Sequence, residues 1–376
     1  MRLLSLLLFV LLLCAGWSVL GQQPELQGMK QNIESKITAF KENPDVSVAL
    51  DDIVYGFNQL IAQLNSAVEQ IPGNKSDQEY ETLAKPDLTA SDKQVFTIYN
   101  ITIGDSRQKV EKQLGAPKRS TSNEYGTKWH AYHKNYQHFL MVSYDENNKV
   151  AGLYTNQDLI ASTKGIKLGT AKGTVHKQLG DPLTRMRKGL VYYQLEENSE
   201  YDLYKMNGNY VTIFYDKHEK NTLTSMQIIS ETLENDKKSL YTNGTQQMKE
   251  GFEYQLFDVT NASRVNHNLP VLQWSPEVQV TARGHSADMA KNNYFNHTNQ
   301  QGQSPFDRME EDKLVFTTAG ENLAAGQFSS IFAHEGLMNS LGHRKNILND
   351  GFEYLGVGVA FGADSRPYYT ENFYAN

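Results

Sequence analysis

Cysteine is almost absent from this chain: its single cysteine, Cys14, lies inside an apolar run near the first residue. A mature chain that has lost this run can form no disulfide of its own, so a packed core must hold it together. No second apolar run is long enough to cross a membrane. A long basic run is also missing, which argues against a nucleic-acid partner, and the formal net charge of −7 favours solubility.

The first residues have the charged start and the apolar middle of an export signal, because an arginine precedes the run Leu3–Leu20. We expect cleavage after Gly21, a small residue with a tolerated valine two positions before it. An uncleaved membrane anchor formed by the same run is the alternative, because about 20 residues span a bilayer. Lipidation of Cys14 is disfavoured by the bulky Leu13 before it. An exported chain without disulfides indicates a bacterial protein that is secreted or held in the cell envelope.

Residues 22–95 are expected to form a helical spacer followed by a linker. Apolar residues recur every three or four positions, which predicts helix within residues 25–71: Leu50, Ile53, Val54, Phe57, Leu60, Ile61, Leu64 and Val68. Asp45 is a candidate N-cap, and Pro72-Gly73 ends the pattern. A spacer helix that packs on its neighbour is favoured over a partner-binding coiled coil, because only about three heptads are visible.

An internal repeat marks residues 96–235. The segment Gly104–Pro117 aligns with Gly169–Pro182, and seven of the 14 positions are identical. Each copy begins at a loop glycine, continues as a short helix and ends at Gly-x-Pro. Two strands joined by a turn are predicted after each helix, at 139–144 and 150–154, and at 210–215 and 223–229. We therefore predict a duplicated helix-plus-β-hairpin domain for interaction or positioning, since neither copy offers a metal cluster or a nucleophile with a base.

The C-terminal segment, residues 245–376, contains several stretches with histidine or glutamate. Ser275-Pro276-Glu277 is a well-formed helix start, and the apolar spacing that follows puts His285 on the buried face of that helix. We expect His285 to be a hydrogen-bonded core residue. His297 follows aromatic residues at the helix exit, where a side chain is free to face a cavity. On chemistry alone, two histidines and a glutamate spread over 47 residues do not define a zinc site as His-Glu-x-x-His does.

Motifs along the whole C-terminal segment nevertheless point to one family. They are Asn261-x-x-Arg264, Leu272-x-Trp274, His285-Ser286-Ala287-Asp288-Met289, Tyr294-Phe295-Asn296-His297, Ser304-Pro305-Phe306-Asp307-Arg308, Gly320-Glu321-Asn322, Met338-Asn339-Ser340-x-Gly342-His343-Arg344-x-Asn346-Ile347-Leu348 and Leu355-Gly356-Val357-Gly358-Val359-Ala360. This series resembles the bacterial branch of the CAP superfamily, the SCP-like proteins related to cysteine-rich secretory proteins, antigen 5 and plant pathogenesis-related proteins. Residues 96–235 resemble the CAP-associated N-terminal domain that precedes such domains. The resemblance implies an α+β protein whose C-terminal domain is an α-β-α sandwich with a central antiparallel sheet and a surface cavity.

The same resemblance implies which residues line the cavity. In the family, two histidines and two acidic residues line it, and a divalent ion can bind there. Three positions match, which makes the expected metal ligands His297, Glu321 and His343. The second acid departs from the pattern, because its position falls on Ser340. The remaining residues expected at the cavity are Glu335, Ser340 and Asn322. Periodicity does not say which way Glu335 faces, because its helix is apolar nearly all round.

Three functions are compatible with these residues. We favour a non-catalytic extracellular module that binds a peptide, lipid or cell-wall fragment, with zinc or another divalent cation as its only expected cofactor. The alternative is a metal-dependent hydrolase, in which Glu321 or a metal-bound water is the base while His297 and His343 hold the ion. The missing acid leaves that mechanism without a second polarising group. The third is a cell-envelope scaffold whose His/Glu cluster is a buried polar network. The N-terminal domain is expected to contact the CAP domain or a partner protein.

Overall fold

The computed structural model describes residues 82–195 and 200–376, while residues 1–81 and 196–199 lie outside it. The predicted export signal and the predicted helix within residues 25–71 therefore lie outside the described residues. The described residues belong to one compact unit. Within it, we call residues 96–235 the N-terminal part and residues 245–376 the C-terminal part.

The N-terminal part is built on a seven-stranded antiparallel sheet with the order β2-β3-β4-β5-β11-β10-β9. Its strands are β2 (Arg119–Ser122), β3 (Lys128–Lys134), β4 (Gln137–Tyr144), β5 (Val150–Thr155), β9 (Tyr201–Met206), β10 (Asn209–Asp216) and β11 (Thr222–Ser230). Helices α4 (Arg107–Leu114) and α5 (Lys172–Leu179) bury Val110 and Val175 in the apolar cluster on one face. The smaller elements are β1 (Phe96–Ile98), β6 (Ile160–Ser162), β7 (Arg185–Lys188), β8 (Val191–Gln194), the 3-10 helix η1 (Lys217–Glu219) and α6 (Glu231–Asp236).

The two halves of this sheet follow the same course. Helix α4 leads to the hairpin β4–β5, and helix α5 leads to the hairpin β10–β11, where the turn signals predict them. Strands β5 and β11 pair at the centre, flanked by β4 and β10 and then by β3 and β9. Two copies related by a two-fold axis would give the order of the six strands from β3 to β9, whereas β2 at the edge has no counterpart, because β7 pairs with β8 in a separate sheet. The duplication itself stays a prediction, and superposing residues 104–154 on 169–229 tests it.

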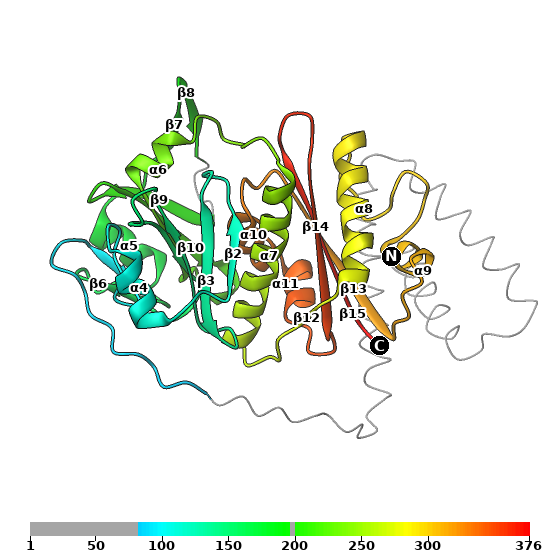
Figure 1. Cartoon of the computed structure of the whole chain (residues 1–376), viewed down its shortest axis with the longest axis horizontal. Coiled ribbons are helices and arrows are strands. Elements are labelled where there is room, and N and C mark those ends of the chain that lie inside the picture. Colours follow the sequence, from blue (N-terminus) through cyan, green and yellow to red (C-terminus); the bar gives the residue numbers. More distant parts are fainter. Residues whose placement is uncertain (1–81, 196–199) are drawn as a thin grey trace, which may run out of the picture. The chain divides into compact units, whose positions relative to one another are not determined.

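The C-terminal part is an α-β-α sandwich around a sheet with the order β12-β14-β15-β13. Its helices are α7 (Gln246–Asn266), α8 (Pro276–Asn292), α9 (Pro305–Glu311), α10 (Ser330–Asn339) and α11 (Leu341–Ile347). Its strands are β12 (Gln273–Trp274), β13 (Thr318–Ala325), β14 (Tyr354–Phe361) and β15 (Pro367–Ala375). Strands β14, β15 and β13 are antiparallel, and the short β12 runs parallel to β14 at the edge. Helix α8 lies on one side of β14 and helix α7 on the other (Figure 1). The α+β class and the sandwich predicted from the sequence are confirmed.

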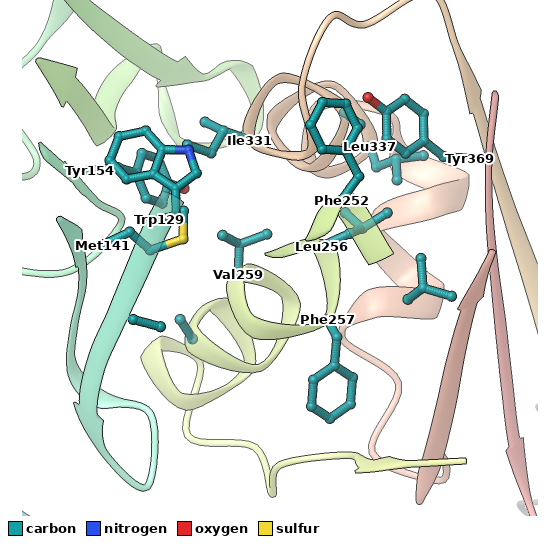
Figure 2. Close-up of a cluster of buried hydrophobic side chains, with 14 of the residues drawn as sticks. Trp129, Met141, Tyr154, Phe252, Leu256, Phe257, Val259, Ile331, Leu337 and Tyr369 are labelled. Atoms are coloured by element: carbon teal, nitrogen blue, oxygen red, sulfur yellow. The ribbon is translucent and has the colours of Figure 1, made fainter. Parts of the chain in front are cut away.

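The second face of the seven-stranded sheet packs on helices α7 and α10 of the C-terminal part. One cluster of buried apolar side chains spans both parts and includes Trp129, Met141 and Tyr154 from the sheet and Leu256, Val259, Ile331 and Leu337 from the helices (Figure 2). The backbones also come very close, because a Cβ added at Gly251 of α7 would lie 2.1 Å from the carbonyl oxygen of Ser122 in β2. The two parts therefore share one core.

A buried carboxylate lies in this shared core. Glu335 of α10 is 7% exposed, and its Oε1 accepts hydrogen bonds from the Tyr154 hydroxyl at 2.8 Å and the Ser225 hydroxyl at 2.6 Å. Both donors come from the seven-stranded sheet. Glu335, which the sequence analysis expects at the cavity, therefore lies on the face of α10 that the N-terminal part covers. Burial raises the pKa of Glu335 to about 7.

Replacing this carboxylate by its amide should stabilise the protein at high pH. The pKa of Glu335 is raised in the folded state, so its favourable contribution is complete below about 4.5 and is lost as the pH rises through about 7. Glu335→Gln keeps an acceptor for Tyr154 and Ser225. We expect its free energy of unfolding to exceed that of wild type at pH 8.5, by up to about 3 kcal/mol, and to equal it at pH 4. Urea unfolding at both pH values measures this. The exposed Glu250→Gln is the control, and a Glu335→Gln gain that is equal at both pH values would contradict the prediction.

Candidate functional site

His297 and Glu321 are in direct contact in the C-terminal part. His297 lies in the segment between α8 and α9, and Glu321 lies within strand β13. The Glu321 Oε1 atom accepts a hydrogen bond from His297 Nδ1 at 2.9 Å. The His297 side chain is 36% exposed, whereas that of Glu321 is 1% exposed. The contact therefore joins a buried acid to an imidazole that reaches the surface.

Arg308 binds the other oxygen of the same carboxylate. Its NH2 group donates to Glu321 Oε2 at 2.7 Å, and its NH1 group donates to the backbone oxygen of His297 at 2.8 Å. Helix α9 presents this arginine, and its start is fixed by a capping box between Ser304 and Asp307 with a proline at the first helical turn. The Asn372 side-chain amide donates to Oε2 as well, at 3.0 Å.

These donors decide the charge of Glu321. Burial alone would raise the pKa of its carboxyl, but the hydrogen bond from His297 and the positive charge of Arg308 outweigh it and lower the pKa. Glu321 is therefore an ionised carboxylate with hydrogen bonds on both oxygens. A carboxylate of this kind is a poor general base, because it has little tendency to take up a proton.

His343 on helix α11 is a neighbour of His297. Burial, and to a smaller extent the nearby His297, lowers the pKa of His343 to about 4, so the imidazole is neutral at pH 7. Its Nδ1 atom has no hydrogen-bond partner among the described residues. The backbone oxygen of His343 accepts from the Asn322 side-chain amide at 3.2 Å. We call His297, Arg308, Glu321 and His343 the His297 cluster.

The other residues predicted at the site lie around this cluster or away from it. Asn322 is fully buried and donates to Glu371 at 3.0 Å as well as to the backbone oxygen of His343, so it contacts the cluster from the buried side. Ser340 is the residue between α10 and α11, and its side chain makes no capping hydrogen bond. Glu335 lies in the shared core. His285 is 1% exposed and its Nε2 donates to the Asn296 backbone oxygen at 2.9 Å, which confirms the predicted core histidine.

Sequence reasoning missed the role of Arg308. The arginine closes the motif Ser304-Pro305-Phe306-Asp307-Arg308, which belongs to the family pattern. The capping signals in that motif predict a helix but give no direction for the side chain that follows. A basic residue one helical turn after the cap was the available signal.

The cluster does not fit a three-ligand zinc site. Across residues 82–195 and 200–376, no group of three or more histidine, cysteine, aspartate or glutamate side chains is arranged to hold a metal ion. Both oxygens of Glu321 already accept hydrogen bonds, Oε1 from His297 and Oε2 from Arg308 and Asn372. What the cluster offers is hydrogen bonding: a neutral imidazole on His343 and a surface imidazole on His297.

An α-β-α sandwich with this histidine and glutamate pair beside a second histidine defines a CAP-type domain. The chain belongs to the cysteine-rich secretory protein family, which residues 257–373 match, and residues 103–255 match the CAP-associated N-terminal family. It is 31% identical over 289 residues to the uncharacterized membrane protein YlbC of Bacillus subtilis, covering 72% of this chain and 82% of YlbC. The resemblance seen in the sequence is confirmed.

Solved structures agree with this assignment. A Bacillus anthracis extracellular protein containing an SCP domain has a TM-score of 0.64 and 28% identity, covering 79% of this chain and 100% of that one. A Staphylococcus aureus cysteine-rich secretory protein has a TM-score of 0.57, covers 73% of this chain and 94% of its own, and at 17% identity shows the fold alone. In the part of the chain that the structure describes, no helix is long and apolar enough to span a membrane.

Proposed function

We propose that this bacterial CAP-domain protein is a non-catalytic binding module that works outside the cell. The observation that supports the proposal best is the state of Glu321. Its two oxygens accept hydrogen bonds from His297, Arg308 and Asn372, so it holds the neighbouring side chains in place and is not free to act as a base. The cluster is therefore better suited to recognising a ligand than to hydrolysing one.

The surface around the cluster suggests the chemistry of the ligand. His297 is partly exposed, and two exposed apolar residues lie two positions from the histidines in sequence: Phe295, at 52%, and Leu341, at 56%. The neutral imidazole of His343 and the partly exposed imidazole of His297, beside apolar side chains, favour a ligand with hydrogen-bonding groups and apolar faces. Among a peptide, a lipid and a cell-wall fragment, we place the cell-wall fragment first, because its sugars and amides combine both properties.

The extracellular location is part of the proposal. It is supported by the apolar run at residues 3–20 and by the names of two similar proteins, one a membrane protein and the other an extracellular protein. The N-terminal residues would either be cleaved on export or keep the domain at the membrane surface.

Co-sedimentation with purified bacterial cell-wall sacculi tests the proposal, with His297→Gln as the main variant. We expect wild type to bind and His297→Gln to bind about tenfold more weakly, because one hydrogen-bonding group at the surface is changed. His176→Gln is a matched control. His176 is 39% exposed and contacts a buried acid, Asp202, at 2.7 Å, but it lies in the N-terminal part. If His297→Gln binds as well as wild type, the His297 cluster is not the binding site. If wild type does not bind, the cell wall is not the ligand.

Two further measurements separate the alternative functions. Soluble fragments released from the sacculi over time, and lost in Glu321→Gln, would favour the hydrolase. Binding that disappears with chelator and returns with zinc would favour a metal at His297 and His343. We expect no release of fragments, because Arg308 holds Glu321 as an ion pair. We expect no dependence on zinc, because no group of three or more possible ligands is arranged to hold a metal ion among the described residues.

A further inference from the structure

The junction between α10 and α11 carries one of the two histidines of the His297 cluster. Helix α10 ends at Asn339, Ser340 follows, and α11 spans Leu341–Ile347 with His343 in its first turn. Helix α11 has seven residues, and a helix this short depends on contacts with its surroundings for its position. The position of His343 therefore depends on the contacts that hold the end of α10 and the start of α11 in place.

The N-terminal part holds the junction through Asn339. Its side-chain amide donates to the Tyr215 backbone oxygen at 2.8 Å, and its side-chain oxygen accepts from the Lys217 backbone N–H at 2.9 Å. The His218 Nε2 atom donates to the Asn339 backbone oxygen at 3.0 Å. All three partners lie where β10 passes into η1. Asn339 is 2% exposed, and its hydrogen bond to Tyr215 is buried, whereas those with Lys217 and His218 are partly buried.

An ion pair fixes the residue next to His343. The Arg344 NH1 group donates to Asp216 Oδ2 at 2.5 Å, with the arginine side chain 10% and the aspartate side chain 8% exposed. The other oxygen of Asp216 accepts the backbone N–H groups of His218 at 2.7 Å and Glu219 at 3.2 Å. Backbone N–H groups of its own turn thus hold Asp216 in place, and Asp216 in turn restrains the side chain of Arg344.

We infer that the β10–η1 turn of the N-terminal part positions His343, with Asp216 and Asn339 as the positioning residues. The inference rests on the proposed function only in treating His343 as part of the binding surface. In this arrangement the CAP-associated domain holds the second histidine of the neighbouring domain in place. Without the Asp216 contact, the end of α11 is still held by the hydrogen bonds of Asn346 and Ile347 within the C-terminal part, but the ion pair beside His343 is lost.

A matched pair of substitutions in the full chain tests the inference. Asp216→Asn removes the charge that holds Arg344. Asp258→Asn removes another buried aspartate that also joins the two parts, through Arg119 at 3.2 Å and the Tyr136 hydroxyl at 2.9 Å, but it acts on α7. Both variants weaken the domain boundary. Only Asp216→Asn acts on α11. A general loosening of the contact between the two parts would therefore change His343 in both variants, whereas the loss of a specific anchor would change it only in Asp216→Asn.

The measurement is the rate at which diethyl pyrocarbonate modifies each histidine at pH 7.5, read by mass spectrometry of peptides. We expect Asp216→Asn to raise the rate at His343 at least about threefold and to speed deuterium exchange across residues 341–348. Asp258→Asn should leave both unchanged. Equal rates at His343 in wild type and Asp216→Asn, or equal increases in the two variants, would overturn the inference.

Asn339→Ala gives a second route to the same answer. It removes the two side-chain hydrogen bonds to the N-terminal part, and a third to the Glu335 backbone oxygen within α10, but no charge. It therefore serves if Asp216→Asn does not fold at the labelling temperature. The expected result is again faster modification of His343, and an unchanged rate would contradict the inference. No ligand takes part in the labelling, so failure to bind sacculi would affect the proposed function and leave this result standing.

Discussion

Replacing Arg308 by methionine is expected to lower the free energy of unfolding by about 3–5 kcal/mol. Methionine fills a similar volume but cannot pair with Glu321, whose side chain is 1% exposed. The carboxylate would then be buried without its cation, which is the costly way to break an ion pair. Urea unfolding at pH 7.5, followed by tryptophan fluorescence, measures the change.

A double variant separates the ion pair from packing. Arg308→Met combined with Glu321→Gln leaves no unpaired charge, so it should recover much of the loss seen for Arg308→Met alone. Arg107→Met is the surface control, because Arg107 and Glu111 form a pair with 37% and 38% of their side chains exposed. We expect it to cost less than about 1 kcal/mol. An Arg308→Met loss as small as this control would mean that Glu321 does not depend on Arg308.

The sequence predicts the parts of the fold that depend on local signals. The Ser275-Pro276-Glu277 helix start gives α8, and its spacing buries His285 as expected. The turn at Asp145–Asn148 sets the hairpin β4–β5. The family motifs bring His297 and Glu321 to within hydrogen-bonding distance, although 24 residues separate them. Each of these features depends on nearby residues or on a recognised pattern.

The sequence predicts that the N-terminal domain contacts the CAP domain or a partner protein, but it does not predict which residues make that contact. Helix α10 is apolar nearly all round, so nothing in its periodicity shows that a second sheet covers the face that carries Glu335. One signal was available in β4, where Phe139, Leu140, Met141 and Val142 form a continuous apolar run. Such a run is typical of a strand buried on both faces. It indicates a second covering layer without saying which helices supply it.

Separating the two parts is expected to have the largest effect of all: a fragment of residues 245–376 should fail to fold stably. Aromatic rings meet across the boundary, with Phe257 of α7 near Tyr136 at 6.3 Å between centroids, and Phe332 of α10 near Tyr201 at 5.2 Å and Phe214 at 4.9 Å. In the fragment these two phenylalanines and their apolar neighbours would face water. Each large apolar side chain contributes about 1.5–3 kcal/mol when buried, and a whole domain is stable by only about 5–15 kcal/mol. Losing a few such contacts therefore removes most of the stability.

The comparison is between the fragment 245–376 and the fragment 82–376, which keeps both parts. We expect 82–376 to be monomeric and to unfold in one cooperative transition, because the two parts share an apolar core. The fragment 245–376 should aggregate or bind a hydrophobic dye, with little cooperative unfolding. Circular dichroism, thermal melting and size-exclusion chromatography distinguish these states. A monomeric 245–376 fragment that melts within a few degrees of 82–376 would show that the CAP domain is stable by itself, and that the N-terminal part contributes position to α10 and α11 without contributing to the stability of the core.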